Sequence, residues 1–488
     1  MVNVPETCLN FINGREVPAT KSQTIEKMNP HSGELLCRIA RSSESDVIAA
    51  VDAAKAAQKA WGALPVVKRG EILFAVADLM SQRREELASI VAVETGKSKK
   101  DALGEVGGAI ALCRFMAGEG QRMFGRTTTS GVVGRLPMII REPIGVVGLI
   151  AAANTPIANV AWKAFPALIC GNSAVMKPSE DAPIIATVMA RLMTEAGVPA
   201  GVFNIVHGLG LETGAPLVGH PDVALISFTG STGVGRAIAE TVGRRMGRVS
   251  LELGGKNPLV VFDDSDLPNA VSWAVLSSFS NAGQRCASSS RLLIQEGVYE
   301  KFKQMLVEKT TALKVGPSDH DDFGPVINAR QLEQMLAAIE QAKADGVKVL
   351  TGGERLKGPQ HSKGYYLAPT ILEGATPSST IAQKELFGPI TCLFRFKDLK
   401  EAIALSNNSS YGLTAAVHTQ SYKTALAFSI GVQSGLVQIN AGTYGSEPHM
   451  PFGGVKQSGN GSREPGPEAL DVYSNLKVIS HNFDLINV

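Results

Sequence analysis

From Glu142 onward, the sequence alternates short apolar runs with helix-like segments. The runs Ile144–Ala152 and Ser173–Lys177 are apolar on both faces, which predicts buried strands. A helix is predicted to begin at Pro156, and another covers Pro183–Ala196. Buried strands that are linked through helices form a parallel sheet with helices on both faces and right-handed connections. The sequence therefore predicts an α/β fold.

The same alternation returns after Pro258, with predicted strands that include Leu259–Phe262 and Thr391–Phe396 and a helix near 267–279. We therefore expect two doubly wound parallel-sheet domains. The segment 122–141 differs because it is rich in Gly, Thr and Val, and it predicts an extended hairpin that protrudes from the body.

The N-terminal part has a pattern of its own. Residues 9–40 predict short strands and turns. Helices follow near 66–92 and 101–119, and an earlier helix begins at Ser43, which has capping-box spacing with Asp46.

The composition limits the partners. The 488 residues carry a formal net charge of +2, so nothing favours nucleic acid or an anionic membrane. The six cysteines have no C-x-x-C spacing, which argues against a structural zinc site and a disulfide framework, and no metal is predicted. No signal peptide is visible, and the most apolar stretch, Ile144–Ile150, is too short to span a bilayer. We expect a cytoplasmic protein.

One cysteine, Cys286, stands on a turn of small residues between a helical run and an apolar run. Gly283 and Ala287 flank it, so its thiol is able to face a cleft instead of a core. A thiolate is a good nucleophile, and backbone N–H groups at such a junction favour it. A single cysteine is also often a small buried hydrophobe, so its role depends on other residues.

A glycine-rich turn, Thr229-Gly-Ser-Thr-Gly-Val-Gly235, follows a predicted strand and opens a predicted helix. Glycines there let a backbone approach a pyrophosphate, and the helix N-terminus supplies N–H donors and a positive dipole end. The spacing is not G-x-G-x-x-G, and no G-x-x-x-x-G-K-[ST] loop is present. A purely structural turn therefore remains an equal alternative.

A second polar turn, Lys177-Pro-Ser-Glu180, ends another strand of the same sheet. Lys177 and Glu180 are placed to hold the two hydroxyls of an adenosine ribose. A carboxylate there disfavours a 2′-phosphate, so NAD is expected before NADP. The alternative is a surface turn that carries a charged pair.

Two further residues have side chains that suit acyl chemistry. Glu252 lies between two leucines on a predicted buried strand, where a carboxylate is costly unless its pKa rises or it is used. With a raised pKa it would act as a general base for water. Asn154 follows another strand end, where its amide would either donate to an oxyanion or cap the next helix.

Together these motifs resemble the aldehyde dehydrogenase superfamily over essentially the whole chain. The separation of Glu252 and Cys286 is 286 − 252 = 34 residues, as the family pattern requires. Further matching segments are Glu142-Pro-Ile-Gly-Val-Val147, Leu251-Glu-Leu-Gly-Gly-Lys-Asn-Pro258, Gly283-Gln-Arg-Cys286, Glu385-Leu-Phe-Gly-Pro389 and Pro451-Phe-Gly-Gly-Val-Lys-Gln-Ser-Gly459.

The resemblance implies NAD(P)-dependent oxidation of an aldehyde to an acid. Cys286 would attack the aldehyde to give a thiohemiacetal, and the amide of Asn154 with the Cys286 N–H would hold the oxyanion. Hydride loss would leave a thioester, which water activated by Glu252 would hydrolyse. The implied cofactor contacts are Lys177, Ser179, Glu180, Gly230, Ser231, Gly235, Leu253, Glu385 and Phe387.

The resemblance also implies a domain plan and an oligomer. The strand 470–480 of a partner subunit would join the protruding hairpin, in a homodimer or homotetramer. The expected units are a cofactor domain (1–121 and 142–254, with 441–465 returning to it), a catalytic domain (255–440) and an oligomerisation domain (122–141 and 466–488).

Substrate choice depends on residues near the nucleophile. The family usually places aromatic residues on both sides of the oxyanion asparagine, whereas this chain has Ala152-Ala-Asn-Thr-Pro156, which puts the pocket shape in doubt. Arg285 would either grip a carboxylate at the far end of the aldehyde or form a structural ion pair. The tail 459–470 resembles that of members that act on α-ketoglutaric semialdehyde and related semialdehydes.

Two rival functions remain at this point. In a CoA-acylating semialdehyde dehydrogenase, CoA instead of water takes the acyl group, but such relatives typically lack the glutamate that matches Glu252. A catalytically silent relative that serves as a structural or binding protein is disfavoured by the intact Cys286, Glu252 and Asn154.

Overall fold

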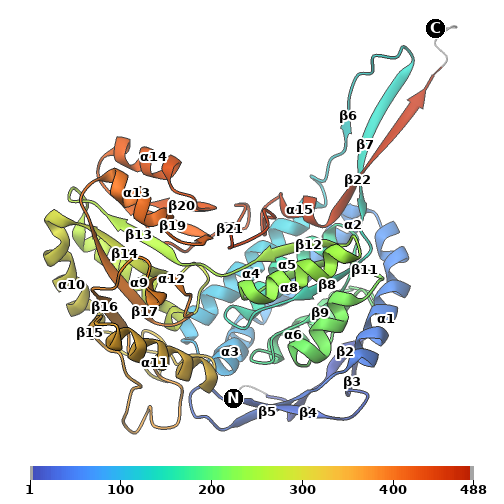
Figure 1. Cartoon of the computed structure of the whole chain (residues 1–488). Coiled ribbons are helices and arrows are strands. Elements are labelled where there is room, and N and C mark those ends of the chain that lie inside the picture. The colour runs from blue at the N-terminus through green and yellow to red at the C-terminus, as the bar shows by residue number, and fades with distance from the viewer. Residues whose placement is uncertain (1–3, 484–488) are drawn as a thin grey trace.

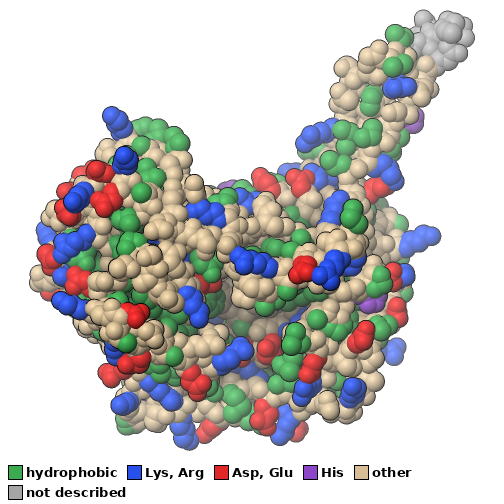
Figure 2. Space-filling view, in the orientation of Figure 1, with side chains coloured by type: hydrophobic (Ala, Val, Ile, Leu, Met, Phe, Trp, Pro, Cys, Tyr) green, Lys and Arg blue, Asp and Glu red, His purple; other side chains and the backbone are tan. Residues whose placement is uncertain are grey.

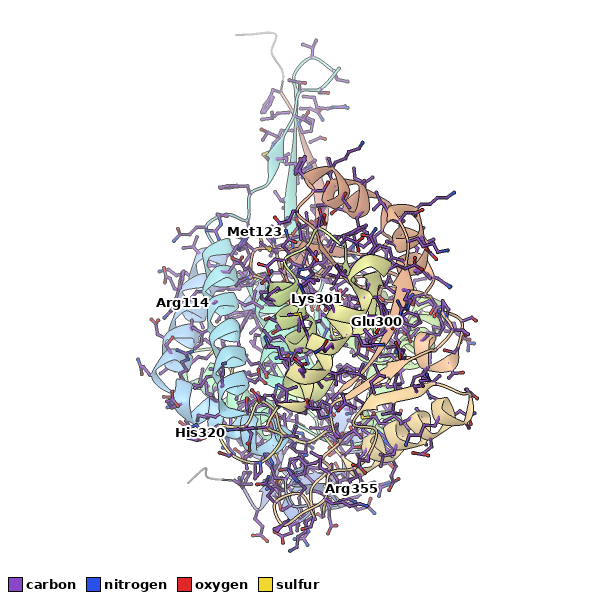
Figure 3. The ribbon with its side chains drawn as sticks, turned by 90° about the vertical axis from the view of Figure 1, so that its left-hand side faces the viewer. Arg114, Met123, Glu300, Lys301, His320 and Arg355 are labelled. Carbon is purple, nitrogen blue, oxygen red and sulfur yellow. The ribbon has the colours of Figure 1, made fainter. Side chains whose placement is uncertain are left out.

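The structure, a computed structural model, describes residues 4–483. It confirms the predicted α/β class, with two seven-stranded sheets in two domains that face each other across a gap, and an arm that rises away from both (Figure 1). A view from a second direction shows Arg114 on the helices of the first domain and Glu300 and Lys301 on a helix of the second (Figure 3).

The first sheet has the order β12-β11-β8-β9-β10-β2-β3. Its five strands from β12 to β10 run parallel, while β2 and β3 are antiparallel additions at one edge. The strand bounds are β2 (Asn10–Ile12), β3 (Arg15–Val17), β8 (Val146–Ile150), β9 (Ser173–Lys177), β10 (Phe203–Ile205), β11 (Val223–Thr229) and β12 (Arg248–Glu252). A smaller sheet, β1-β5-β4, lies beside it, with β1 (Thr7–Cys8), β4 (Thr24–Met28) and β5 (Leu35–Ala40).

Helices cover both faces of the first sheet, as apolar side chains at successive strand positions require. Val146 packs into one buried cluster with α1, α7 and α8, and Val147 packs into another with α2 to α6. The helix bounds are α1 (Glu44–Ala63), α2 (Val66–Gln82), α3 (Arg84–Thr95), α4 (Lys99–Glu119), α5 (Pro156–Ile169), α6 (Ile184–Glu195), α7 (Ala215–Gly219) and α8 (Thr232–Arg244). The predicted capping box at the start of α1 is present.

The second sheet has the order β15-β16-β17-β14-β13-β19-β20, and all its neighbours are parallel except β15, which runs antiparallel at the edge. The bounds are β13 (Asn257–Val261), β14 (Ser289–Gln295), β15 (Lys348–Thr351), β16 (Thr370–Glu373), β17 (Ile390–Phe396), β19 (Thr414–His418) and β20 (Leu436–Ile439). Its helices are α9 (Leu267–Phe279), α10 (Tyr299–Thr311), α11 (Ala329–Ala344), α12 (Thr380–Gln383), α13 (Leu399–Asn407) and α14 (Tyr422–Gly431), and a short ladder joins β18 (Tyr411–Gly412) to β21 (Val455–Lys456).

The arm corrects one expectation. It consists of β6 (Arg126–Thr127), β7 (Arg135–Pro143) and β22 (Ser474–Asn482), which follows the short helix α15 (Ala469–Val472). We expected the C-terminal strand to come from a partner subunit, but β22 pairs with β7 of the same chain along its whole length. The reason is connectivity, because α15 ends beside the base of β7 and delivers the next residues directly to it. The end of the predicted oligomerisation segment, 484–488, lies outside the described residues, as do residues 1–3 of the N-terminus in which no signal peptide was seen.

The surface carries both signs of charge. On the face shown in Figure 2, Lys and Arg side chains alternate with Asp and Glu side chains, and the surface is hollowed between the two domains. Within residues 4–483, none of the helices combines the length and the apolar character that crossing a membrane requires.

Candidate active site

Two adjoining cavities lie between the domains, where the parallel strands β8, β9, β11 and β12 of the first sheet end. One has a volume of about 710 Å³ and the other about 330 Å³. Asn154, Ser231 and Phe387 border both. Strand register brings the ends together, because Ile150 pairs with Lys177 and Thr229 pairs with Glu252. Ligands of open parallel sheets bind at this edge.

Cys286 lines the smaller cavity, on a turn that the backbone fixes. Asn281, Ala282 and Gly283 all have left-handed φ angles of 54°, 54° and 67°. A Cβ atom on Gly283 would lie 2.2 Å from the carbonyl oxygen of Gly388, so only glycine fits there. The Asn257 amide donates to the Cys286 carbonyl over 2.7 Å and holds the far side of the turn.

The Cys286 thiol is held in its neutral form. Desolvation by the surrounding protein, followed by the charges of Glu385 and Glu252, raises its pKa to about 12. The thiol is therefore protonated near neutral pH, and a nucleophilic attack requires that its proton be transferred to a base.

Asn154 borders the same cavity, and its amide orientation is set by a neighbour. Its Oδ1 accepts from Asn159 Nδ2 at 3.3 Å, and Asn159 Nδ2 also donates to the Ala152 carbonyl at 3.0 Å. Within residues 4–483, Asn154 Nδ2 donates to no protein acceptor, which leaves its N–H groups for a ligand. The structure therefore places an amide donor and the thiol on one small cavity, instead of using Asn154 as a cap for α5.

Glu252 ends β12 and lines this cavity with its side chain almost fully buried. Neither of its carboxylate oxygens has a hydrogen-bond partner in the described part of the chain. Burial, with the charge of Glu464 adding to it, raises the pKa of Glu252 well above its ordinary value. A buried, unpaired carboxyl group with a raised pKa has the properties of a general acid–base residue.

A buried polar cluster lies beside Glu252. Its side chains come from α5, β11 and β12, which are far apart in the sequence, and from the C-terminal segment. Lys163 Nζ forms an ion pair with Glu464 at 3.1 Å, and each side chain is 1% exposed. Glu464 also accepts from the hydroxyls of Ser227, Ser250 and Tyr473 over 2.8–3.0 Å. The cluster connects the C-terminal segment to the first sheet.

The larger cavity brings together most of the predicted cofactor residues. Lys177, Ser179, Glu180, Gly230 and Ser231 all line it. Lys177 Nζ lies 3.4 Å from Glu180, and burial lowers the pKa of Lys177 although Glu180 opposes this effect.

Leu253 and Glu385 line only the smaller cavity, and Gly235 lines neither. Phe387 borders both cavities. Glu385 accepts from the Gly255 N–H at 3.1 Å, and burial raises the pKa of Glu385 to about 7. Gly235 serves packing, because a Cβ atom there would lie 2.6 Å from the Leu253 side chain.

The donors around the larger cavity fit a dinucleotide. Ser231 is the N-cap residue of α8, and its hydroxyl makes no capping hydrogen bond, so the hydroxyl and the first N–H groups of the helix are able to meet a pyrophosphate. Lys177 and Glu180 offer a donor and an acceptor for ribose hydroxyls, and Leu211 and Ile238 supply apolar wall for a planar ring. Residues 4–483 contain no cluster of His, Cys, Asp and Glu side chains that would hold a metal ion.

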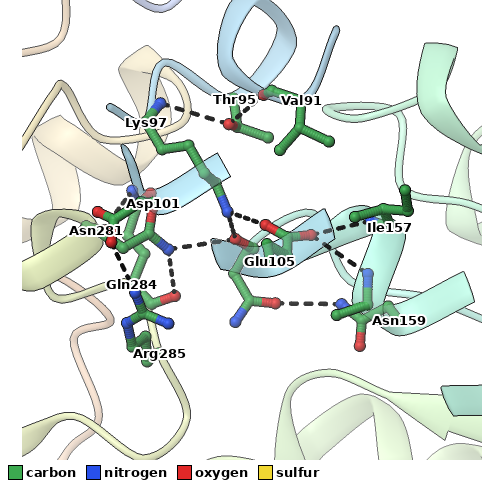
Figure 4. Close-up of polar contacts among 12 residues, drawn as sticks. Val91, Thr95, Lys97, Asp101, Glu105, Ile157, Asn159, Asn281, Gln284 and Arg285 are labelled. Atoms are coloured by element: carbon green, nitrogen blue, oxygen red, sulfur yellow. Dashed lines mark hydrogen bonds and ion pairs between the residues drawn. The ribbon is translucent and has the colours of Figure 1, made fainter. Parts of the chain in front are cut away.

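Arg285 makes the structural ion pair that was one of its two predicted roles. Its guanidinium lies 3.3 Å from Asp101 of α4 (Figure 4). It also lies 4.9 Å from the ring centre of Tyr444. Its Nε atom is buried and has no partner among the described residues. Arg285 therefore keeps one donor that the protein does not use, but the residue lines neither of the two cavities.

The sequence reasoning missed the aromatic wall of the smaller cavity. Trp162 and Phe452 pack edge to face with ring centres 5.1 Å apart. They supply aromatic surface that is missing beside Asn154, where Thr155 stands. The sequence held a signal for both residues. Trp162 lies within α5 close to Asn154, and Phe452 lies in the segment 451–459 that matches the family. Neither position alone shows that the side chain lines the smaller cavity.

A thiol, an amide donor and a buried carboxyl group on one cavity, beside a larger cavity whose donors fit a dinucleotide, are the parts of a cysteine-dependent oxidoreductase. The Aldehyde dehydrogenase family matches residues 17–479. The chain belongs to this family, and it is an aldehyde oxidoreductase.

Individual relatives agree over the full length. The chain is 38% identical to an alpha-ketoglutaric semialdehyde dehydrogenase of Bacillus subtilis (strain 168), over 98% of this chain and 99% of the relative. It is 38% identical to an aldehyde dehydrogenase of Emericella nidulans, over 96% and 94% of the two chains. Among solved structures, betaine aldehyde dehydrogenase from Staphylococcus aureus in complex with NAD+ superposes with a TM-score of 0.95 at 33% identity, covering 98% of this chain and 96% of that chain.

Proposed function

We propose that the protein is a hydrolytic, NAD-dependent aldehyde dehydrogenase in which Cys286, Asn154 and Glu252 perform the chemistry. The observation that carries the proposal is that these three side chains line one small cavity next to the dinucleotide-shaped cleft. The neutral thiol, the unused amide donor and the unpaired carboxyl group each have a task in acyl transfer.

Each residue acts at a defined atom. Cys286 Sγ bonds to the aldehyde carbon as its proton passes to the Glu252 carboxylate, which releases that proton to solvent before the hydrolysis step. Asn154 Nδ2 and the Cys286 N–H hold the oxygen that becomes negative. Lys177, Ser179, Glu180 and Ser231 line the larger cavity and would hold a dinucleotide there, which would supply the acceptor for the hydride. Glu252 takes a proton from water, which attacks the thioester and releases the acid and the thiol.

The test of this proposal is the variant Cys286→Ala. We expect it to lose aldehyde-dependent NADH formation completely while its Kd for NAD stays within about twofold of the parent value, since the sulfur lies outside the larger cavity. Residual turnover above the background would exclude Cys286 as nucleophile. Parallel assays with and without CoA separate hydrolysis from acyl transfer to CoA, and absence of NADH formation across a broad aldehyde panel would favour a catalytically silent relative.

We further propose an acidic semialdehyde as the substrate. One observation supports this choice, namely the 38% identity to an alpha-ketoglutaric semialdehyde dehydrogenase. Arg285 directly precedes Cys286 in the chain but lines neither cavity, so a contact with a substrate carboxylate requires its side chain to turn toward the smaller cavity. Arginine binds carboxylates through parallel N–H donors.

The substrate proposal is tested with Arg285→Ala and a panel of α-ketoglutaric semialdehyde, succinic semialdehyde, hexanal and betaine aldehyde. Loss of a charged hydrogen bond should raise KM for the two acidic aldehydes about tenfold or more and leave the neutral one unchanged. An equal effect on all four aldehydes would contradict a carboxylate contact at Arg285. A preference of the parent enzyme for betaine aldehyde would point instead to recognition of a cation by Trp162 and Phe452.

We also propose that the arm mediates a homodimer or homotetramer. Leu476 and Val478 on β22 expose about two thirds of their surfaces, at 65% and 64%. Exposed apolar residues on a projecting strand favour a protein partner. The domain bounds and the cytoplasmic location stay predictions.

A further inference from the structure

Helix α4 contacts the candidate catalytic residues from outside both cavities. Lys97 lies two residues before the first residue of this helix, and Glu105 lies on its second turn. Neither residue lines a cavity. Figure 4 shows the two side chains side by side, between the turn that carries Arg285 and the start of α5.

Lys97 and Glu105 form an ion pair that is buried on both sides, with side-chain exposures of 2% and 5%. The ammonium also donates to the Asn154 carbonyl at 2.7 Å. Asn281, from the turn before Cys286, donates to the same carbonyl at 3.2 Å. The backbone of Asn154 is thus bound to a charged donor and to the nucleophile turn.

Glu105 fixes the other side of Asn154. Its Oε1 accepts from the N–H groups of Ile157 at 3.0 Å and Ala158 at 3.3 Å. Pro156 at the first helical position has no N–H group, so Glu105 takes the first two donors that α5 has. These donors are therefore unavailable to a substrate oxygen, and Asn154 Nδ2 remains as the side-chain donor at this place.

Stability alone is a weak reason for such a pair. The cost of removing both charges from water offsets most of their attraction, and apolar residues of similar size often stabilise a protein equally well. Orientation is a better reason, because the pair fixes the residues on both sides of an amide whose donor direction decides oxyanion stabilisation.

We propose that Lys97 and Glu105 are positioning residues that hold the Asn154 amide toward the substrate oxygen. This inference rests on the proposed role of Asn154 as oxyanion donor. The pair touches neither aldehyde nor cofactor, so its effect should appear in the rate of the chemical step and not in the binding of NAD.

The experiment is a double-mutant cycle on kcat with Lys97→Met and Asn154→Ala. We expect Asn154→Ala to lower kcat about 100- to 1,000-fold, as loss of an oxyanion donor does. Lys97→Met should lower kcat about 10- to 100-fold, because a displacement of about 1 Å costs up to that much. In the Asn154→Ala background, Lys97→Met should change kcat less than about threefold, since there is no amide left to misplace.

A second cycle combines Glu105→Gln with Asn154→Ala. The substituted amide side chain has no charge but keeps an oxygen that accepts from the N–H groups of Ile157 and Ala158. The matched control is Lys303→Met, which breaks the ion pair between Lys303 and Glu373 at 3.0 Å, far from both cavities, and should leave kcat unchanged. KM and the Kd for NAD should stay within about twofold in all variants, and Tm reports any loss of folded protein.

The outcomes separate two failures. If Asn154→Ala retains the parental kcat, the proposed role of Asn154 is wrong. If Asn154→Ala is impaired but Lys97→Met lowers kcat by the same factor in both backgrounds, the positioning role is overturned and the pair is only structural. An unchanged kcat in Lys97→Met and Glu105→Gln would overturn it as well.

Discussion

Removal of the Lys163 ammonium should destabilise the protein more than removal of both members of its ion pair. Lys163 and Glu464 lie 3.1 Å apart with 1% of each side chain exposed. Deleting one partner of a buried pair leaves the other charge without compensation, at a cost of about 3–5 kcal/mol, whereas neutral replacement of both is often harmless.

The hydrogen bonds around the pair predict which single change costs more. Without Lys163, the Glu464 carboxylate keeps donors from Ser227, Ser250 and Tyr473. Without the Glu464 charge, the ammonium keeps a hydrogen bond at 2.7 Å only to Ser227 and whatever the new amide oxygen offers. We therefore expect about 3 kcal/mol for Lys163→Met and about 5 kcal/mol for Glu464→Gln.

Urea unfolding followed by fluorescence and circular dichroism would measure these losses, and calorimetry would give Tm. For a domain of about 150–250 residues, a loss of about 3 kcal/mol corresponds to a fall of roughly 6–12 °C in Tm. The double variant Lys163→Met/Glu464→Gln should lose only about 1–2 kcal/mol. A double variant that loses the sum of the two single effects, about 8 kcal/mol, would refute the reasoning, because the charges would then not depend on each other.

Three other perturbations have defined outcomes. Glu252→Gln should release about one equivalent of NADH per active site in a rapid burst and then turn over slowly, because a neutral amide cannot take a proton from water. Steady turnover at the parental rate would contradict the role of Glu252 as a base. Gly283→Ala should yield little active enzyme, since its Cβ would lie 2.2 Å from the Gly388 oxygen at a φ of 67°, and unchanged activity and Tm would show that the turn adapts. Burial raises the pKa of Glu94 from 4.5 to about 8, so its contribution to stability is complete below pH 4.5 and is lost as pH rises through 8. As the pH is raised from 5 to 8, the free energy of unfolding from urea titrations should therefore decrease, by at most about 1.4 kcal/mol per pH unit. Glu94→Gln should flatten this slope. A variant that keeps the parental slope would assign the effect to another group.

The alternation of strands and helices could be predicted because it depends on local patterns. Consecutive apolar residues located β9 at Ser173–Lys177 without error, and Pro156 marked the first residue of α5. Strand β16 was missed, since Thr370–Glu373 is short and contains a glutamate. The source of β22 was predicted wrongly because pairing between strands that are far apart in the sequence has no local signal.

The candidate site was predictable where a residue type and its place at a strand end suggest a task, as for Cys286, Glu252 and Asn154. The supporting contacts were not predictable in this way. Asp101 reaches Arg285 across 184 positions of sequence, and Lys97 reaches Asn154 across 57. Such contacts depend on how segments that are distant in the sequence pack together, within a domain or between two domains, which a reading of local periodicity does not describe.

The left-handed turn before Cys286 has a consequence for the evolution of the enzyme. Backbone geometry and the Asn257 amide hold the sulfur, while different residues, among them Thr155 and Trp162, form the wall that an aldehyde meets. Mutations in that wall can thus alter the range of accepted aldehydes without moving the nucleophile. Selectivity and reactivity are inherited through separate parts of the chain, so a new substrate range is reachable by few substitutions from a scaffold that already works.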